Sequence, residues 1–362
     1  MTEICRTHLE HPGAWRGSDF ASKDDFSFDL EGRHLKAIER AMDRIRKQGL
    51  GLDDIEREHF QLEEIAEDIA GYYNELRDGR GFFMLRGFPL DRYTQDEIGM
   101  IYWGLGTHLG VGVSQSVLGD RLGHVKDFSQ NDPNARAYRN NKELDLHTDL
   151  SDIVSLLSLA KAAEGGSSQF VSALTVHNEI LAQHPEYLEP LYRGFRYHRA
   201  GEEAPGEEPV TPWNVPVFAY LEGRLSTRYV RAYLERGHAI LDQPLTELEL
   251  AALDYLDTVA QREKLEVVIE PGEAVFQNNY TVFHARSGFT DDPAKGQVRH
   301  LLRLWLDVPE NGYPAVKEMR THAGAGIARQ EGRMPSGEGD AYKEIIRARK
   351  AASTSSDVRP LR

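Results

Sequence analysis

The stretch Leu146-His147-Thr148-Asp149 places an imidazole and a carboxylate two residues apart, and the rest of the chain is best understood from it. If residues 144–146 form a strand that ends here, the side chains of His147 and Asp149 project from the same face and can both reach one metal ion. Two histidines and one carboxylate with open coordination positions suit non-heme Fe(II), which must also bind a co-substrate and oxygen. Because the His-x-Asp pattern also occurs by chance, a second histidine must come from elsewhere.

We predict that this second histidine is His284, in Gln277-Asn278-Asn279-Tyr280-Thr281-Val282-Phe283-His284-Ala285-Arg286. Taken alone, a histidine in such a segment is more often a buried residue satisfied by the backbone. The segment that follows it, Arg299-His300-Leu301-Leu302-Arg303-Leu304-Trp305-Leu306, reverses this preference. The order of His-x-Asp, a distant histidine and an Arg-x-x-x-Arg strand is much more specific than any of its parts.

Arg299 and Arg303 lie four residues apart, so on a strand their side chains share one face and both can point into the interior that holds the metal. Burying an arginine without an anion is costly, whereas its planar guanidinium matches a carboxylate with two parallel hydrogen bonds. The pair therefore predicts carboxylate ligands. The alternation of leucines at 302, 304 and 306 with Arg303 and Trp305 does not say which face lines the pocket.

The composition limits the class of protein. The 362 residues include 58 acidic and 43 basic residues, and the net charge of −15 argues against a nucleic-acid partner. Cys5 is the only cysteine, which excludes an internal disulfide and a cysteine-based metal cluster. No signal segment or membrane-spanning run is expected, so we predict a cytoplasmic protein.

Many short strands interrupted by helices predict a mainly β protein with a double-stranded β-helix, the cupin-like jelly roll. We expect three regions: an N-terminal arm and helices over 1–79, a double-stranded β-helix core over 80–314 with a helical insert at about 173–262, and a polar extension over 315–362 that ends in a charged tail from Lys343. Periodicity and capping residues predict helices over 34–48, 62–76, 94–108, 173–183, 185–192 and 246–261. Strands are predicted over 82–86, 113–117, 122–128, 144–146, 154–160, 169–172, 215–220, 224–227, 265–269, 274–278 and 301–308.

Between residues 80 and 310, approximately, the chain resembles the TauD/TfdA-like family of Fe(II)- and 2-oxoglutarate-dependent dioxygenases, also described as taurine/2,4-D dioxygenase-like or clavaminate synthase-like. The likeness is carried by the His147–Asp149 pair, Gly165-Gly166-Ser167-Ser168, His284 and the segment 299–306. The resemblance implies that His147, Asp149 and His284 are the iron ligands.

The resemblance also assigns the polar residues beside the iron. Arg299 would pair with the far carboxylate of 2-oxoglutarate, and Ser168, where family members often carry threonine, would be its hydroxyl partner. Arg303 would face the metal-proximal carboxylate or an acidic group of the substrate. From its place on the predicted strand before the iron motif, Gln115 is a candidate substrate contact, although a polar residue on a sheet edge explains it as well.

The implied reaction consumes O2 and 2-oxoglutarate, releases succinate and CO2, and oxidises an unactivated carbon, usually by hydroxylation. The expected substrate is a small anionic or zwitterionic molecule, such as an amino acid, a sulfonate or a natural-product intermediate. Asp149 disfavours halogenation, because a small residue in its place would leave a position for halide. Desaturation and ring closure remain open, as does the oligomeric state, for which a homodimer would suit the family.

Two other functions compete with the oxygenase. One is a jelly-roll protein that binds a metal and a ligand without turnover, and the presence of all three ligands and both arginines argues against it. The other is a zinc hydrolase that uses the same ligands, and it leaves the paired arginines unexplained.

Overall fold

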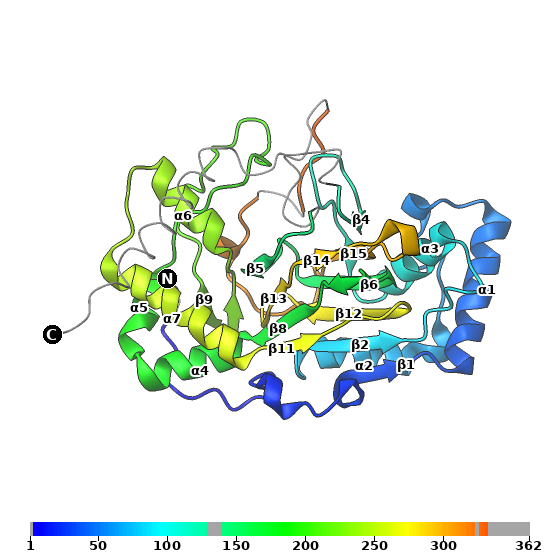
Figure 1. Cartoon of the computed structure of the whole chain (residues 1–362), viewed down its shortest axis with the longest axis horizontal. Coiled ribbons are helices and arrows are strands. Elements are labelled where there is room, and N and C mark those ends of the chain that lie inside the picture. The colour runs from blue at the N-terminus through cyan, green and yellow to red at the C-terminus, as the bar shows by residue number, and fades with distance from the viewer. Residues whose placement is uncertain (1–2, 129–139, 323–325, 332–362) are drawn as a thin grey trace.

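The computed structural model describes residues 3–128, 140–322 and 326–331, and in these residues two β-sheets face each other (Figure 1). The larger sheet has seven described strands in the order β1-β2-β12-β6-β15-β3, with β4 also paired to β15. The smaller sheet has the order β11-β8-β13-β5. The strands are β1 Ser27–Asp29, β2 Phe82–Arg86, β3 Val111–Gly112, β4 Leu122–Val125, β5 Leu144–His147, β6 Ile153–Ala160, β8 Ser168–Ser172, β11 Leu265–Val267, β12 Glu273–Asn278, β13 Val282–Arg286 and β15 His300–Asp307.

The space between the sheets is filled by side chains from both. Met84, Val275 and Leu301 of the larger sheet meet Phe170 and Val282 of the smaller one in a single buried cluster. Successive side chains of a strand point to opposite faces, so Arg303 and Trp305 share the inward face of Leu301. The leucines at 302, 304 and 306 face the other way, into a helical layer. The predicted jelly roll is confirmed, and the inward face of β15 carries Arg303.

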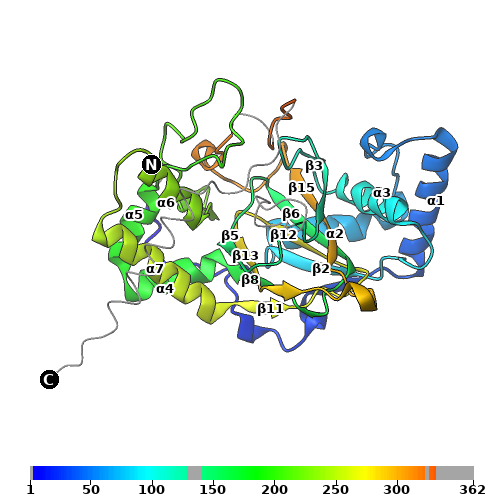
Figure 2. The same ribbon diagram turned by 45° about the horizontal axis from the view of Figure 1, so that its top comes forward.

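Helices cover the outer faces of both sheets. The helices α1 Gly32–Gln48, α2 Ala66–Arg77 and α3 Gln95–Gly106 pack on the larger sheet, and α4 Ala173–Gln183, α5 Leu188–Arg193 and α7 Glu247–Glu263 pack on the smaller one. Figure 2 shows these two helical groups on opposite sides of the strands. The remaining elements are α6 Arg231–Ile240, the hairpin β9 Phe218–Leu221 with β10 Arg224–Thr227, and the pair β7 Glu164–Gly165 with β14 Phe289–Thr290.

Reciprocal capping explains why two of the predicted helices begin where they do. At the start of α3, Thr94 Oγ1 accepts a hydrogen bond from the Glu97 N–H at 3.3 Å, and Glu97 Oε2 accepts one from the Thr94 N–H at 3.0 Å. Thr246 and Glu249 repeat the arrangement at the start of α7. Each pair satisfies backbone donors that the helix itself cannot satisfy. Both predicted starts are confirmed.

Other predictions were wrong. The strand expected over 113–117 is a loop, closed by the Gln115 N–H to the Asp120 carbonyl at 2.8 Å and the Gly119 N–H to the Ser116 carbonyl at 2.9 Å. These local bonds use backbone groups that a strand ladder would need, so β3 ends at Gly112. The helix α6 and the short strand β1 were not predicted.

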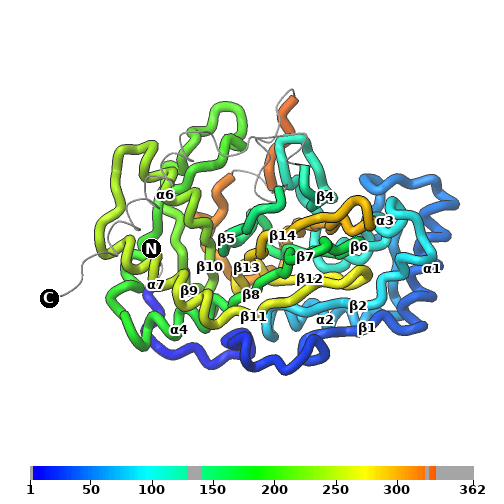
Figure 3. Tube along the Cα trace, viewed as in Figure 1, coloured from blue at the N-terminus to red at the C-terminus, as the bar shows by residue number. Residues whose placement is uncertain are grey.

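The N-terminal segment closes one end of the space between the sheets. Trp15 and Phe26 belong to the same buried cluster as the inward side chains of the sheets. The Trp15 ring lies 4.9 Å from that of Phe82, centroid to centroid, and its Nε1–H donates to the Arg80 carbonyl at 2.8 Å. Figure 3 shows this segment running beneath β11 and β2. We call Trp15 and Phe26 the N-terminal plug.

The three-region division at 79 and 314 stays a prediction. β1, in the first region, pairs in parallel with β2, in the second. The charged tail from Lys343 lies outside the described residues. Among the residues that are described, no helix is both long enough and apolar enough to cross a membrane.

The burial of Leu304 on β15 predicts a large effect of its truncation on stability. Leu304 is fully buried against the helical layer, so Leu304→Ala should lower the free energy of unfolding by about 2–5 kcal/mol. Leu248→Ala, at a position 44% exposed, should change it by less than about 0.5 kcal/mol. Urea unfolding of both variants gives the two values. Equal stability of the two variants would contradict the packing of Leu304 against the helical layer.

Candidate active site

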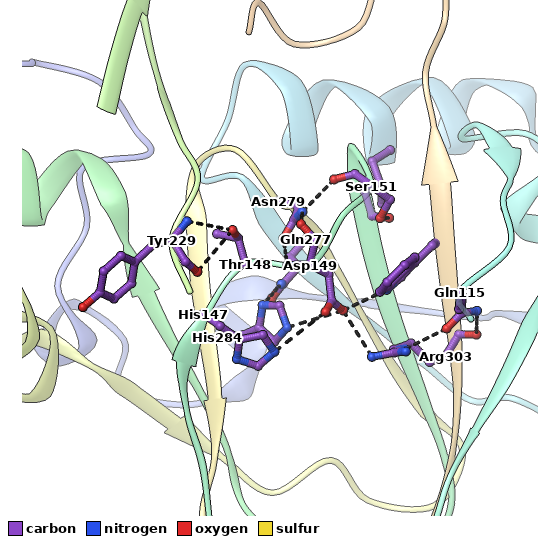
Figure 4. A network of polar contacts seen from close by, with 12 residues as sticks. Gln115, His147, Thr148, Asp149, Ser151, Tyr229, Gln277, Asn279, His284 and Arg303 are labelled. Atoms are coloured by element: carbon purple, nitrogen blue, oxygen red, sulfur yellow. Dashed lines mark hydrogen bonds and ion pairs between the residues drawn. The ribbon is translucent and has the colours of Figure 1, made fainter. Parts of the chain in front are cut away.

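Pairing between β13 and β5 brings the predicted ligands together. His284 lies directly opposite His147 in this antiparallel pair, with the ring centroids 4.1 Å apart. Asp149 completes the group, with Oδ1 3.8 Å from His147 Nε2 and Oδ2 3.7 Å from His284 Nε2. One donor atom from each residue lies within 4.8 Å of the other two. Figure 4 shows the three side chains pointing toward one another.

Backbone contacts hold the His147–Asp149 segment from two sides. The Thr148 N–H donates to the Tyr229 carbonyl at 2.8 Å, and Thr148 Oγ1 accepts from the Tyr229 N–H at 3.0 Å. On the other side, the buried Asn279 amide accepts from the Asp149 N–H at 2.9 Å and donates to the carbonyls of Asp149 and Ser151. The segment is thereby fixed before any ligand binds.

Hydrogen bonds at Nδ1 orient both imidazoles. His147 Nδ1 lies 2.8 Å from the Asp145 carbonyl, so the neutral ring carries its proton there and leaves Nε2 free. The side-chain nitrogen of Gln277, Nε2, lies 2.6 Å from His284 Nδ1, whereas Gln277 Oε1 is buried without a hydrogen-bond partner among the described residues. Exchanging the two amide atoms would give both of them a partner. A ring that offers Nε2 to a metal has its proton on Nδ1, and this requires the amide oxygen of Gln277 at that position. Both rings can thus present Nε2 to one ion.

The electrostatics favour the ligating forms. Burial, together with the neighbouring His284 ring, lowers the pKa of His147 to about 3, so this imidazole is neutral at ordinary pH. Burial alone would raise the pKa of Asp149, but the Arg303 guanidinium and the His284 ring hold it below its usual range. Histidine and carboxylate ligands must be deprotonated to bind a divalent cation, and the directions found for His147 and Asp149 agree with this. These residues therefore fit an iron ion.

Arg303 is already engaged in this structure. Its Nη1 lies 3.4 Å from Asp149 Oδ2, which also accepts a hydrogen bond from Trp305 Nε1 at 2.8 Å. Its Nε–H donates at 2.7 Å to Gln115 Oε1, and the Gln115 amide donates back to the Arg303 carbonyl at 2.8 Å. Gln115 is buried and holds Arg303 in place, and its contact with a substrate stays a prediction.

Two further buried arginines form a second cationic group. The guanidiniums of Arg299 and Arg286 lie 5.2 and 4.9 Å from the centroid of the Phe289 ring. Burial and the nearby Arg286 lower the pKa of Arg299 to about 9, and burial lowers that of Arg286 to about 10. Arg299 Nη1 and Arg286 Nε and Nη1 are buried without a hydrogen-bond partner among the described residues. Such donors fit a carboxylate, which would offset their burial.

The segment 165–168 lies against this cationic group. Gly166 has a φ of 74°, and a Cβ there would lie 3.0 Å from Arg299 Nε, so glycine permits the close approach. Ser168 lies opposite Arg286 in the β8–β13 pair, so the two side chains share the inward face. Ser168, Arg286 and Arg299 thus surround one region of the interior.

Sequence reasoning assigned no role to Arg286, Gln277 or Asn279, although all three stand in the quoted segment around His284. Arg286 follows His284 by two residues on the same strand, and this spacing was the available signal for a shared face. Gln277 lies on β12 and His284 on β13, and the sequence does not show that the turn between these strands brings the two side chains together. The role of Asn279 depends on contact with a segment 130 residues away.

The chain matches the family described as Taurine catabolism dioxygenase TauD, TfdA family over residues 46–305. It is 32% identical over 330 residues to an FR-33289 synthase of Streptomyces rubellomurinus, covering 89% of this chain and 96% of that relative. A taurine hydroxylase-like protein, SAT17, of Stachybotrys chartarum is 26% identical over 309 residues, covering 80% of this chain and 77% of that one.

Solved structures with the same fold include an asparagine oxygenase in complex with Fe(II), 2S,3S-3-hydroxyasparagine and succinate. Its TM-score is 0.63 at 19% identity, covering 80% of this chain and 98% of that one. The non-heme iron oxygenase OrfP, in complex with Fe and alpha-ketoglutaric acid, gives a TM-score of 0.58 at 16% identity, covering 78% and 94% of the two chains.

The role of Gln277 can be tested through metal affinity. Gln277→Leu removes the acceptor that orients His284, so the dissociation constant for Fe(II), measured anaerobically, should rise by roughly 10- to 100-fold. Gln277→Glu keeps an oxygen acceptor and should retain more of the affinity. Unchanged binding by the leucine variant would show that packing alone orients the ring.

Proposed function

The chain belongs to the taurine catabolism dioxygenase TauD, TfdA family, and from this premise we propose that it hydroxylates an unactivated carbon of a small anionic or zwitterionic molecule. It is an Fe(II)- and 2-oxoglutarate-dependent oxygenase. In the proposed reaction, substrate, O2 and 2-oxoglutarate yield hydroxylated substrate, succinate and CO2. The observation that carries the proposal is the His147, Asp149 and His284 cluster next to buried arginines that lack an anion.

His147, Asp149 and His284 would hold the iron, through the two Nε2 atoms and a carboxylate oxygen. Bound Fe(II) supplies the coordination positions and the redox chemistry that couple decarboxylation of 2-oxoglutarate to oxidation of the substrate. The hydrogen bond from Trp305 Nε1 to Asp149 Oδ2 would fix the orientation of the carboxylate that binds the metal. The presence of this carboxylate favours hydroxylation over halogenation.

Arg299, with Ser168 and Arg286 on the adjoining face, would bind the far carboxylate of 2-oxoglutarate. The unpaired N–H donors of both arginines support this assignment, since a carboxylate accepts from two such donors at once. Arg303 would then serve the metal-proximal side, where its Nη1 already lies near Asp149. These roles orient the co-substrate with its two ends fixed by different residues.

The substrate class is supported by two proteins of the same fold: the asparagine oxygenase is in complex with 2S,3S-3-hydroxyasparagine, and OrfP is also known in complex with Fe and L-Arg. Both ligands are small zwitterions. We also propose a cytoplasmic enzyme, in keeping with the acidic composition, and a homodimer, as the family suggests. A zinc hydrolase would leave Arg299 and Arg286 without a ligand, so the oxygenase is the better account of the same residues.

Loss of a ligand should abolish the reaction without unfolding the chain. Asp149→Ala and His147→Ala should each form no succinate from 2-oxoglutarate with Fe(II) and ascorbate, because the remaining two ligands hold iron weakly. Succinate is measured with candidate amino acids and sulfonates, and far-UV circular dichroism checks the fold. Full succinate formation by either variant would remove the metal assignment.

Arg299→Ala should raise the 2-oxoglutarate concentration needed for half-maximal turnover by roughly 10- to 150-fold. The range corresponds to the loss of charged hydrogen bonds worth roughly 1.5–3 kcal/mol. Arg286→Ala should have a smaller effect, because Arg286 Nη2 already donates to the carbonyls of Asn140 and Lys142. Arg40→Ala, on the exposed side of α1, is the control. An unchanged requirement in Arg299→Ala would mean that another cation holds the co-substrate.

A further inference from the structure

Residues 326–331, which we call the C-terminal segment, lie against the loop that carries Gln115. Gly326 forms a parallel bridge with Ser114, the residue before Gln115. The Ile327 N–H donates to the Ser114 carbonyl at 2.9 Å. The two backbones are therefore joined at the position next to Gln115.

Further contacts attach the C-terminal segment to the same loop and to β15. The Gln330 N–H donates to the Val117 carbonyl at 2.8 Å. Ile327 is fully buried, in a cluster that also contains Val113, Val117 and Trp305. The family match ends at residue 305, so the chain beyond this match packs against a side chain that contacts one of the proposed iron ligands.

Glycine at position 326 permits this close contact. Its φ is 71°, and a Cβ there would lie 2.4 Å from the Ser114 carbonyl oxygen and 3.0 Å from the Val113 Cβ. The first of these atoms belongs to the backbone, so no change of rotamer could relieve the overlap. Any larger residue at position 326 would therefore push the C-terminal segment and the loop apart.

The Gln115 amide connects this loop to Arg303. Its Nε2 donates to the carbonyls of Arg121 at 3.0 Å and Arg303 at 2.8 Å, and its Oε1 accepts from Arg303 Nε at 2.7 Å. Because Nε2 faces two carbonyls, which only accept hydrogen bonds, the amide has one orientation and Oε1 must face the guanidinium. Gly123 leaves room for this contact, since a Cβ there would lie 2.7 Å from Gln115 Oε1.

Contacts on two sides orient the Arg303 guanidinium. Gln115 accepts a hydrogen bond from its Nε–H, and its Cζ atom lies 4.8 Å from the centroid of the Trp305 ring. In this orientation Arg303 Nη1 lies 3.4 Å from Asp149 Oδ2 (Figure 4). An arginine that is already held in place loses less conformational freedom when it binds a ligand.

We propose that Gln115 and the C-terminal segment, through Gly326, position Arg303 for the reaction, because they hold its guanidinium where it serves the metal-proximal carboxylate of 2-oxoglutarate. This inference rests on the proposed function, which gives Arg303 that role. Gln115 and Gly326 are thus positioning residues, and they act through Arg303. Their effect extends to the binding of 2-oxoglutarate in the absence of substrate, which a contact between Gln115 and the substrate would not influence.

A pair of glycine variants tests the role of the C-terminal segment. Gly326→Ala places a methyl group against the Ser114 carbonyl, and Gly223→Ala is the matched control. Gly223 has a φ of 78° in the turn between β9 and β10, and a Cβ there would meet no heavy atom within 4 Å apart from its chain neighbours. Both variants impose a similar backbone strain, but only Gly326→Ala displaces the loop.

The measured quantity is the dissociation constant for 2-oxoglutarate, obtained by titration calorimetry on the full chain with Fe(II) and without oxygen or substrate. It should rise by about 3- to 10-fold in Gly326→Ala, because binding must then immobilise a mobile arginine. In Gly223→Ala it should change by less than about twofold. Far-UV circular dichroism checks the fold of each variant.

Two further variants assign the effect to Gln115 and Arg303. Gln115→Leu removes the acceptor for Arg303 Nε and should weaken 2-oxoglutarate binding by about tenfold, whereas Gln115→Glu keeps an oxygen there and should retain more of the affinity. Arg303→Gln removes the guanidinium itself. In that background Gly326→Ala should add less than about twofold, because no guanidinium is left to position.

Wild-type affinity for 2-oxoglutarate in folded Gly326→Ala would overturn the proposal. The same loss with and without Arg303 would overturn it too, because the segment would then act by another route. If Gly326→Ala does not fold, Ile327→Ala, which loosens the same segment without strain, takes its place in the same measurements and is judged in the same way.

Two outcomes separate this inference from the proposed function. If wild-type protein with Fe(II) fails to bind 2-oxoglutarate, the proposed function itself is wrong. If Arg299→Ala weakens binding of 2-oxoglutarate but Arg303→Gln or Gly326→Ala does not, the proposed function stands and only the positioning of Arg303 is refuted.

Discussion

The pairing of β13 with β5 is the constraint on which the rest of the site depends. It sets His284 directly opposite His147, so the backbone ladder of the smaller sheet determines the distance between two proposed metal ligands. The ladder shifts register between His284 and Arg286, and such bulges redirect side chains near functional sites. Asp149 lies beyond the end of β5 and depends instead on Asn279 and Tyr229. The strand pairing and the contacts of Asn279 and Tyr229 together position the three proposed ligands.

Part of the charge buried in the interior is already paired, and this pairing offsets the cost of burying it. Asp149 is balanced by Arg303 and by the donor Trp305, all within one hydrogen-bond network. Among the described residues Arg299 and Arg286 form no ion pair, and Arg299 Nη1 and Arg286 Nε and Nη1 are buried without an acceptor. This part of the interior therefore lacks hydrogen-bond acceptors, which a bound anion would supply.

Much of this arrangement was accessible from the sequence, and the failures have physical causes. Capping pairs and periodicity identified α3 and α7, because those signals are local. The order of the metal motif and the arginine strand identified the family and its jelly roll. The sequence did not show which face of β15 points inward, because both faces carry apolar residues: leucines on one, and Leu301 with Trp305 on the other. The strand predicted over residues 113–117 was wrong, because the hydrogen bonds of a turn at Gln115 outweighed the β propensity of these residues. The helix α6 contains Gly237, whose missing Cβ admits the Arg196 carbonyl, a contact invisible in sequence.

The N-terminal plug has a consequence for the smallest chain that can fold. The family match begins at residue 46, yet Trp15 and Phe26 fill the end of the space between the sheets. A shortened version designed on the matched region alone would leave Phe82 and its neighbours facing water at that end. The start of the family match and the physical start of the barrel are therefore different, and the barrel starts some thirty residues earlier.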